Sequence, residues 1–548
     1  MGTMANQQVY LTTVFQMKNV AAVTMLNIAA GTAAMAPLLG AFLSDNYIGR
    51  YATLAFASLA SLLGMVLLTL TAAITKLHPP TCTQPQECQG PTPFQMFVLF
   101  SAYFLLIIGA GGIRPCNLAF GVDQFNPNMD SGRRGISSFF NWYYCTFTCA
   151  VMVSSTVIVY VQSNISWAIG LGIPAVLMVL SCIAFFIGTK LYVIVKPQGS
   201  PFTGFVQVPV AAFKKWWVKI SELPEKELFD PPYLSSLATK LLHTNQFKFL
   251  DKAAVVTSED KIKSNGEAAD PWRLCTMQQV EIVKCFIRII PIWFSCVLFY
   301  IPLSQHNNFT VYQAQQMDCR LGHRGFQIPA GSFVVFNMLT LTVWIPIYDR
   351  LIVPQLRKIT KHEEGITVLQ RMGVGIAISI LGMVVSALIE QRRRYIALHK
   401  QPQEVASTSW TISSMSSFWL LPQLILFGLC EAFNMIDQTQ FFYHQFPENM
   451  KSVGMAVFFL GQAVSNYTSG ILVMTVHKVT GRKGSRNWLS QDLSKGRLDL
   501  FYLTVAGLGM FNLVYFIVCA KYYRSNGTGN GAKPKVTSEV EEEMTIPF

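Results

Sequence analysis

The amino-acid sequence predicts an all-α membrane protein built from two six-helix bundles, on the basis of three observations. The chain has 548 residues, of which 51% are hydrophobic and 13% charged, with a mean hydropathy of +0.37, whereas soluble domains carry about 25% charged residues. Apolar stretches of about 20 residues or more, long enough to cross a bilayer, recur along the chain. A long polar stretch separates them into two sets.

The predicted spans of the first set lie at 19–43, 51–75, 94–119, 137–161 and 167–189, and those of the second set lie at 279–304, 328–348, 366–389, 414–441, 453–477 and 498–520. The amphipathic segment from Gly2 to Met17 precedes them. As a helix it would measure about 24 Å, which is shorter than the bilayer core of about 30 Å. We interpret it as the second half of a first helix that is truncated at its N-terminus, which completes a plan of six plus six helices.

These spans divide the chain into four parts. We expect an N-terminal bundle at 1–189, a cytoplasmic linker at 190–276, a C-terminal bundle at 277–521 and a disordered polar tail at 522–548. The linker contains Phe213-Lys214-Lys215-Trp216-Trp217, an aromatic and basic segment typical of a helix on a membrane surface. Because apolar residues are too scattered in the linker to predict a core, we expect a tether rather than a separate domain.

The basic loops of the first half predict which ends of the helices face the cytoplasm. Arg50, Arg133 and Arg134 lie on the same side as the linker, and basic residues accumulate in cytoplasmic loops. Topology therefore explains the net charge of +13, and we expect no nucleic-acid partner. Two groups in the second half, Arg392 to Arg394 and Arg482 to Arg486, fall on the opposite side and fit the charge rule poorly.

The loops on the non-cytoplasmic side contain residues suited to oxidation and glycosylation. Cys82 and Cys88 share one polar loop and are candidates for a disulfide. Asn164 begins the sequon Asn-Ile-Ser and is a candidate for glycosylation. Most other cysteines lie in apolar runs, where a thiol is usually a small hydrophobic group. Because the chain has no CxxC pair and no HExxH motif, we expect no metal site and no cofactor.

Two ionisable residues stand inside predicted spans, where a charge is costly and usually functional. Arg114 follows the glycine-rich segment at 109–113, and Glu431 lies in the apolar run from Phe427 to Phe433. Arg114 is a candidate for a wet central cavity. The alternative is an arginine near a helix end whose guanidinium extends to the lipid headgroups.

A loop with acidic and basic residues recurs in both halves. Asp45 and Arg50 follow the predicted span at 19–43, and Asp349 and Arg350 follow the span at 328–348. Charged pairs at helix ends can stabilise one arrangement of two bundles and break in another, so we expect these four residues to form a gate. The alternative is a solvated loop whose basic residue only sets the orientation.

Several short motifs together resemble one known family. The loop at 40–51 is similar to the major facilitator motif. It occurs with GGIRP at 111–115, DQF at 123–125, FFNW at 139–142, LDKAA at 250–254, PWRLCT at 271–276, PAGSF at 329–333 and FFY at 441–443. In this combination, which covers nearly the whole chain, the sequence resembles the plant nitrate/peptide transporter family, the proton-dependent oligopeptide transporters of plants.

The resemblance implies a major facilitator fold in which Arg114 and Glu431 form a pair across a central cavity. It also implies alternating access, with a small-molecule substrate and protons carried together across the bilayer. The family's E-x-x-E-[K/R] motif of the first helix is absent from this sequence. We interpret this absence as truncation, and the alternative is a protein without ordinary proton coupling.

The expected substrate also follows from the resemblance. Thr148 and Ala150 replace the usual Asn and Gly, and position 114 is Arg rather than Lys, a pattern similar to the subfamily of nitrate, glucosinolate and other glucoside carriers. We expect a plant glucoside or organic anion, with nitrate as the alternative. Candidate contacts, although the sequence favours plain helix packing for each of them, are Trp293, Asn434, Gln438 and Tyr443. Asp437 is a further candidate, but its spacing from Glu431 places it on a different helix face.

The sequence as a whole therefore predicts a secondary active transporter in the plasma membrane, with the vacuolar membrane as the alternative location. An alternative of another class is a non-transporting isoform that acts as a sensor or regulatory partner. We do not expect an enzyme, because no set of nucleophile, base and orienting group is present.

Overall fold

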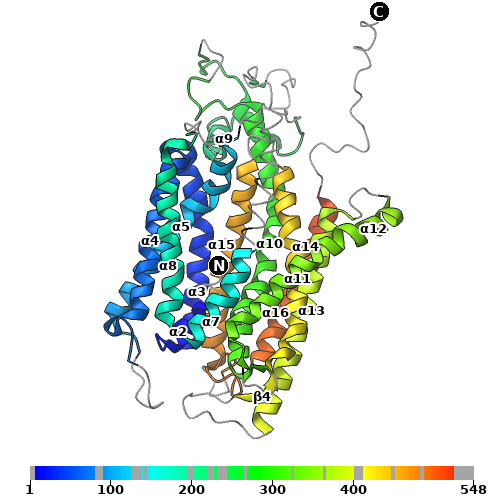
Figure 1. The fold of residues 1–548 in the computed structure, drawn as a ribbon. Helices are drawn as coiled ribbons and strands as arrows, with labels where there is room; N and C mark the ends of the chain where they lie inside the picture. Colours follow the sequence, from blue (N-terminus) through cyan, green and yellow to red (C-terminus); the bar gives the residue numbers. More distant parts are fainter. Residues whose placement is uncertain are drawn as a thin grey trace, which may run out of the picture. The chain divides into compact units, whose positions relative to one another are not determined.

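A computed structural model describes residues 6–80, 90–125, 139, 146, 149–194, 202–218, 228–230, 243–263, 268–321, 326–361, 366–399, 412–445, 451–481 and 487–523. These residues are mostly helical (Figure 1). Contacts divide the chain into two compact units. The larger comprises Met1–Pro201, Pro291–Phe442 and Val453–Val518, and the smaller comprises Phe202–Ile290, Tyr443–Ser452 and Cys519–Phe548.

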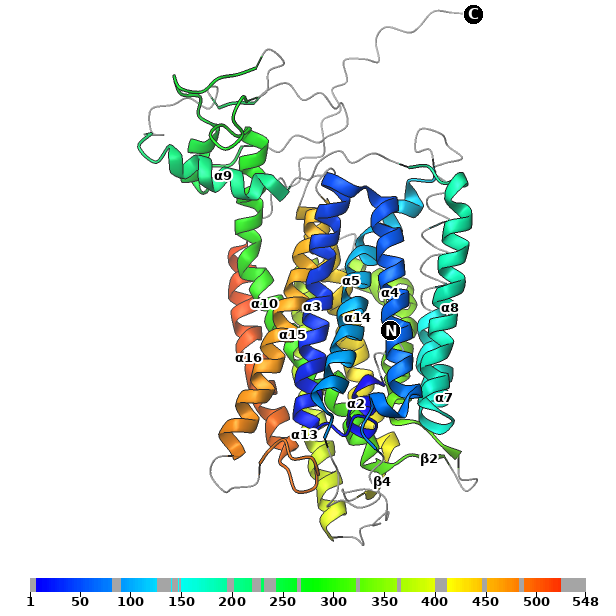
Figure 2. The same cartoon turned by 90° about the vertical axis from the view of Figure 1, so that its left-hand side faces the viewer.

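The N-terminal half of the larger unit is a set of packed helices. They are α2 (Gln7–Thr13), α3 (Asn19–Leu43), α4 (Arg50–Ala73), α5 (Pro93–Val122), α7 (Val159–Asn164) and α8 (Trp167–Ile187). Neighbours α4 and α5 pack together, α8 packs on α4, and α3 packs on α5 (Figures 1 and 2). Short α2 packs against α3. The predicted spans at 19–43, 51–75, 94–119 and 167–189 match α3, α4, α5 and α8.

The C-terminal half is also helical. Its helices are α10 (Met277–Gln315), α11 (Val334–Ile347), α12 (Val353–Thr360), α13 (Val368–His399), α14 (Leu421–Gln445), α15 (Lys451–Gly481) and α16 (Leu498–Tyr522). Two small sheets lie in the connections: β1 (Met317–Asp318) pairs in parallel with β4 (Ser413–Ser416), and β2 (Arg320–Leu321) pairs antiparallel with β3 (Phe326–Gln327).

The helices agree with the all-α membrane class. Among the described residues, 10 helices are long and apolar enough to cross a membrane. The span predicted at 137–161 is described mainly from its second part, as a shorter apolar helix at Cys149–Asn164. Helices α10 and α13 extend past the predicted spans at 279–304 and 366–389, because polar residues at their ends continue the helix beyond the apolar run.

Two arginines that fit the charge rule poorly, Arg392 and Arg393, lie at the polar end of α13 and contact other parts of the protein there. Arg393 is fully buried and donates from Nε and Nη2 to the Glu390 carboxylate, at 2.8 Å each. Gln313 on α10 donates to the same carboxylate at 2.8 Å. The guanidinium of Arg392 lies 4.3 Å from the ring centroid of Trp419. These two arginines therefore serve tertiary structure on the side predicted to be non-cytoplasmic.

The smaller unit contains much of the linker and has a core of its own. Its helices are α9 (Phe202–Lys214), the 3₁₀ helix Lys248–Ala254 and the first part of α10. The core consists of Val208, Ala211, Ala212, Leu250, Ala253, Ala254, Cys275, Val280 and Val283. The expectation that apolar residues here are too scattered for a core was therefore wrong, because segments far apart in sequence bring them together.

Buried ion pairs accompany this linker core. The Nζ atom of Lys284 lies 2.6 Å from Asp251 and 2.7 Å from Glu281, and its side chain is fully buried. The Nζ atom of Lys215 donates to the Val255 carbonyl at 2.6 Å and lies 2.7 Å from Asp260. The linker is thus fixed by specific polar contacts as well as by apolar packing.

Candidate functional site

Arg114 lies where three helices approach closely. A Cβ atom at Gly40 of α3 would come within 2.0 Å of the Gly111 carbonyl of α5, and one at Gly109 would come within 1.8 Å of the Ser61 hydroxyl of α4. Only glycine permits these approaches. The Arg114 side chain is exposed, and its Nη1 donates to the Ala33 carbonyl of α3 at 3.2 Å. The glycine-rich segment therefore sets the helix packing around Arg114.

Glu431 lies on α14 in the other half of the chain. Its side chain is 7% exposed, and Oε1 accepts a hydrogen bond from Nδ2 of Asn337 on α11 at 3.2 Å. Asn337 was not predicted as a site residue. Its presence inside the apolar run at 328–348 was a signal for it, because a polar side chain in a span usually has a specific partner.

Arg114 and Glu431 form no ion pair in this conformation of the described chain. Each side chain instead has a partner within its own half: Arg114 on the Ala33 carbonyl, and Glu431 on Asn337. The predicted pair across a cavity therefore remains a prediction, which requires a conformation other than the one described. The two groups do lie on helices of opposite halves, as a pair of this kind requires.

The amide and aromatic candidates for substrate contact mostly have protein partners. Asn434 donates to the Met372 carbonyl of α13 at 3.0 Å, and Gln438 donates to Asn434. Trp293 donates from Nε1 to the Val457 carbonyl at 2.9 Å. These bonds give Trp293, Asn434 and Gln438 a packing role in this conformation. The side chain of Tyr443 lies outside the described residues.

Asp437 has a basic partner that the sequence did not reveal. Its Oδ1 lies 3.0 Å from Nε of Arg371, which is near the start of α13. Arg371 also donates from Nη2 to Gln440 at 3.1 Å. Both residues are largely buried, with side chains 13% and 3% exposed for Arg371 and Asp437. This pair joins α13 to α14 within the C-terminal half.

One residue of the predicted gate, Arg50, pairs with an acidic residue that was not predicted to belong to the gate. Arg50 begins α4, and its Nη1 lies 2.7 Å from both carboxylate oxygens of Asp123, just after α5. The side chains of Asp45 and Asp349 lie outside the described residues, and Arg350 is exposed. The repeat itself is visible in the backbone: Ser44–Ile48 and Tyr348–Ile352 are both π-helical turns, each with aspartate second.

Hydrogen bonds between the two halves lie from the middle of the helices towards the predicted non-cytoplasmic side. Asn27, near the start of α3, accepts from Ser304 at 2.9 Å and from Asn308 at 3.1 Å, both on α10. Thr32 of α3 and Tyr467 of α15 bring their hydroxyls within 2.8 Å. The halves are therefore joined through α3, from its middle towards this side of the molecule.

The remaining predicted sites are only partly described. Cys82 and Cys88 lie outside the described residues. Asn164 is the last residue of α7, and its side chain is exposed. The disulfide and the glycosylation therefore stay predictions, although the exposure of Asn164 meets one requirement for glycosylation.

The repeated halves, the apolar helices and the polar contacts between halves define an integral, multi-pass membrane transporter of the major facilitator type. A family model described as PTR2, POT family, matches residues 51–489. The chain belongs to this POT family. The family and the major facilitator fold predicted from the sequence are thereby confirmed, whereas the truncation of the first helix stays a prediction. Relatives in this family are named as transporters rather than enzymes.

Individual relatives are similar over nearly the whole chain. Protein NRT1/ PTR FAMILY 2.11 of Arabidopsis thaliana is 49% identical over 543 residues, covering 98% of this chain and 88% of that protein. Protein NRT1/ PTR FAMILY 2.13 of the same plant is 47% identical over 527 residues, covering 95% and 84%. The solved POT family transporter PepTSo has a TM-score of 0.68 at 19% identity, covering 95% of this chain and 94% of its own.

Proposed function

We propose that this POT-family transporter works by alternating access and carries a plant glucoside or organic anion together with protons. The observation that carries the proposal is the surroundings of the two charged residues inside the membrane-spanning helices, Arg114 and Glu431. Among the described residues, the exposed Arg114 donates to a backbone carbonyl, whereas Glu431 is buried beside a neutral amide. Neither partner neutralises the charge, so both groups are suited to binding an ionic species during transport.

The contacts between halves support a two-state mechanism. The bonds to Asn27 connect the halves on the predicted non-cytoplasmic side, and the Thr32–Tyr467 contact connects them near the middle of α3 and α15. Opening that side requires these bonds to break. A proton on Glu431 or an anion at Arg114 would change which state is stable, because a ligand shifts an equilibrium by its difference in affinity for the two states.

An anion is the substrate charge that the exposed Arg114 favours. A guanidinium binds carboxylate, sulfate or phosphate groups through two parallel hydrogen bonds. One solved POT family transporter, with a TM-score of 0.60 and 13% identity, is in complex with 5-aminolevulinic acid, which supports a small charged organic molecule. The same fixed cation favours nitrate as the second candidate.

Uptake into oocytes tests this proposal. Cells expressing the chain would be given labelled nitrate and a panel of labelled glucosides and organic anions at two external pH values. We expect uptake of at least one organic anion that increases at the lower external pH, and its loss in Arg114→Ala. Arg392→Ala, which removes an exposed arginine stacked on Trp419, is the matched control and should keep uptake.

Three outcomes would count against the proposal. Uptake of nitrate alone would show that the substrate is nitrate and not a glucoside or organic anion. Equal uptake at both pH values would show that transport is not coupled to protons. A surface-expressed chain that takes up none of the compounds would favour a sensor or regulatory partner. A fluorescent fusion of the same chain, located at the plasma membrane or the vacuolar membrane, tests the proposed location.

A further inference from the structure

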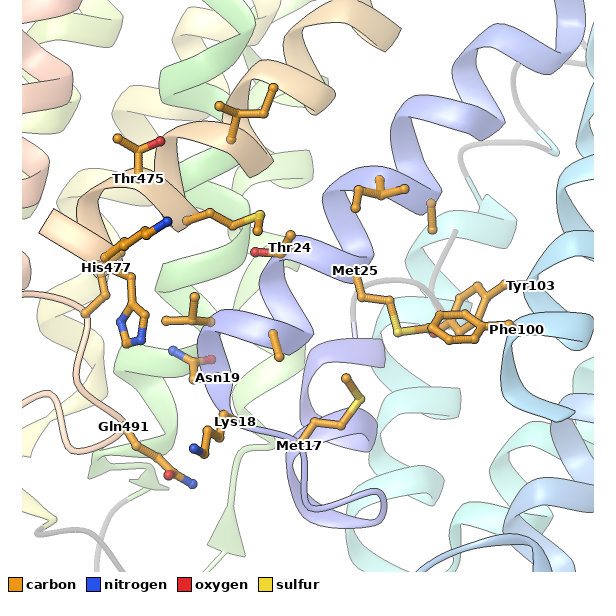
Figure 3. A pocket seen from close by; sticks show the side chains of 18 of the residues that line it. Met17, Lys18, Asn19, Thr24, Met25, Phe100, Tyr103, Thr475, His477 and Gln491 are labelled. Atoms are coloured by element: carbon orange, nitrogen blue, oxygen red, sulfur yellow. The ribbon is translucent and has the colours of Figure 1, made fainter. Parts of the chain in front are cut away.

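A large groove lies on the larger unit between α3, α5 and α15 (Figure 3). Its volume is about 1170 Å³. Apolar side chains from all three helices form its walls, among them Met25 and Ile28 of α3, Phe100 and Phe104 of α5, and Met474 of α15. Because α3 and α5 belong to the N-terminal half and α15 to the C-terminal half, the groove crosses the boundary between halves.

The charged side chains of this groove lie at one end. Lys18 directly precedes α3, and Lys478 is in the last turn of α15. Both helix ends are on the side predicted to be non-cytoplasmic, where His477 also contributes to the lining. The groove therefore has a basic end at the depth of the lipid headgroups and apolar walls towards the bilayer centre.

Two buried polar groups that line the groove have no hydrogen-bond partner within the described chain. Asn19 is 2% exposed, and its Oδ1 accepts from Gln8 at 3.0 Å, but its Nδ2 has no acceptor among the described residues. The hydroxyl of Thr24, a residue that is 9% exposed, likewise has no hydrogen-bond partner among the described residues. Unsatisfied buried donors are costly, so an acceptor that reached these two groups would stabilise this part of the groove.

The length of the groove matches a lipid in one leaflet. From Lys18 to Thr32 the helix α3 rises about 21 Å, and one leaflet contributes about 15 Å of hydrocarbon below its headgroups. We propose that this groove binds one phospholipid of the non-cytoplasmic leaflet. Its phosphate lies between Lys18 and Lys478, its ester and phosphate oxygens accept from Asn19, and an acyl chain runs along α3.

The position of this lipid allows it to stabilise one arrangement of the two halves. Thr32 lines the groove, and its hydroxyl is 2.8 Å from that of Tyr467 on α15. A phospholipid that contacts α3 and α15 together favours the arrangement in which they are close, because it binds only when both walls are present. This site is independent of the transported substrate, and its test requires no transport.

Native mass spectrometry of the purified full chain tests the proposal. The protein would be supplied with phosphatidylglycerol or with digalactosyldiacylglycerol, which has the same acyl chains but no phosphate. We expect one tightly retained phosphatidylglycerol, and weaker retention of the galactolipid. Lys18→Gln and Lys478→Gln should each weaken retention of phosphatidylglycerol about fivefold, because one basic residue near an anionic headgroup contributes about that factor.

Two further variants keep the result interpretable. Ala21→Phe places a ring in the groove at an exposed position of α3 and should displace the lipid. The double variant Lys76→Gln/Lys495→Gln removes two exposed lysines outside the groove and should retain the lipid as the unaltered chain does. Equal retention of the two lipids would overturn the proposal, as would retention that Ala21→Phe leaves unchanged.

Discussion

Polar side chains inside the helical halves of this transporter take their partners from neighbouring helices. Glu431 is bound by Asn337 of α11, and Asn434 donates to the Met372 carbonyl of α13. Trp293 of α10 donates to the Val457 carbonyl of α15. In lipid no water is present to satisfy such groups, so each bond fixes the rotation of one helix against another. The sequence identified Glu431 because a carboxylate in a span is rare. It also marks Asn337 as a polar residue inside an apolar run, but it could not show which side chains pair.

The fully buried Arg393 gives a prediction at this scale. Arg393→Met should destabilise the protein by about 3–5 kcal/mol, because it leaves the Glu390 carboxylate buried without its cation. The double variant Glu390→Gln/Arg393→Met should recover part of the loss. Thermal unfolding of the purified protein in one detergent measures both. Arg392→Met is the control, and if it lowered the midpoint as much as Arg393→Met, the buried pair would not be the cause.

At the scale of single elements, the linker is the part whose organisation differs most from expectation. Its apolar residues are dispersed in sequence, at 208–212, 250–254 and 275–283, and meet only through the fold. Periodicity detects one amphipathic helix at a time and cannot show that three short segments share a core. The same limit applies to Asp260, whose partner Lys215 lies 45 residues away.

The ionisation of Asp260 should make the stability of the linker depend on pH. Burial raises the pKa of its carboxyl, but hydrogen bonds from Lys215 and Thr257 outweigh burial, so the pKa lies below its ordinary value of 3.8. A lowered folded pKa contributes stability above the unfolded value, and this contribution is lost as the pH falls below 3.8 through the folded pKa.

Hydrogen exchange of the linker amides at 248–263 measures this contribution. Asp260→Asn should reduce protection at neutral pH, and its difference from the unaltered chain should shrink as the pH falls below 3.8. Asp270→Asn, at an exposed position, is the control and should show a much smaller difference. A deficit in Asp260→Asn that is equal at all pH values would mean that ionisation of Asp260 does not stabilise the linker.

The loop between α3 and α4 gives a second prediction for an element. Arg50 binds Asp123 with side chains 35% and 17% exposed, so we expect this pair to contribute less than about 1 kcal/mol to stability. If it belongs to a gate, Asp123→Ala should reduce uptake severalfold with an almost unchanged unfolding midpoint. The exchange Arg50→Asp/Asp123→Arg should restore part of the uptake. Full uptake by Asp123→Ala would exclude this pair from gating.

Across the whole molecule, local patterns predicted the spans well and long-range contacts poorly. Hydropathy located α3, α4 and α5 within a few residues of their bounds, because the bilayer imposes both length and composition on a span. The repeated loops were also evident. Arg50, in contrast, is bound to Asp123, which is 73 residues away, and nothing in the spacing of acidic residues distinguished Asp123 from Asp45.

Alternating access requires the bonds between halves at Asn27 to break in every cycle. Oxidative cross-linking of Asn27→Cys to Asn308→Cys tests this requirement most directly, because the native side chains are bonded across the halves at 3.1 Å. We predict that uptake is lost when the cross-link forms and returns on reduction. A cross-link between Ser295→Cys and Asn512→Cys, both within the C-terminal half, is the control and should preserve uptake. Unchanged uptake through a chain fully cross-linked from Asn27→Cys to Asn308→Cys would contradict the mechanism.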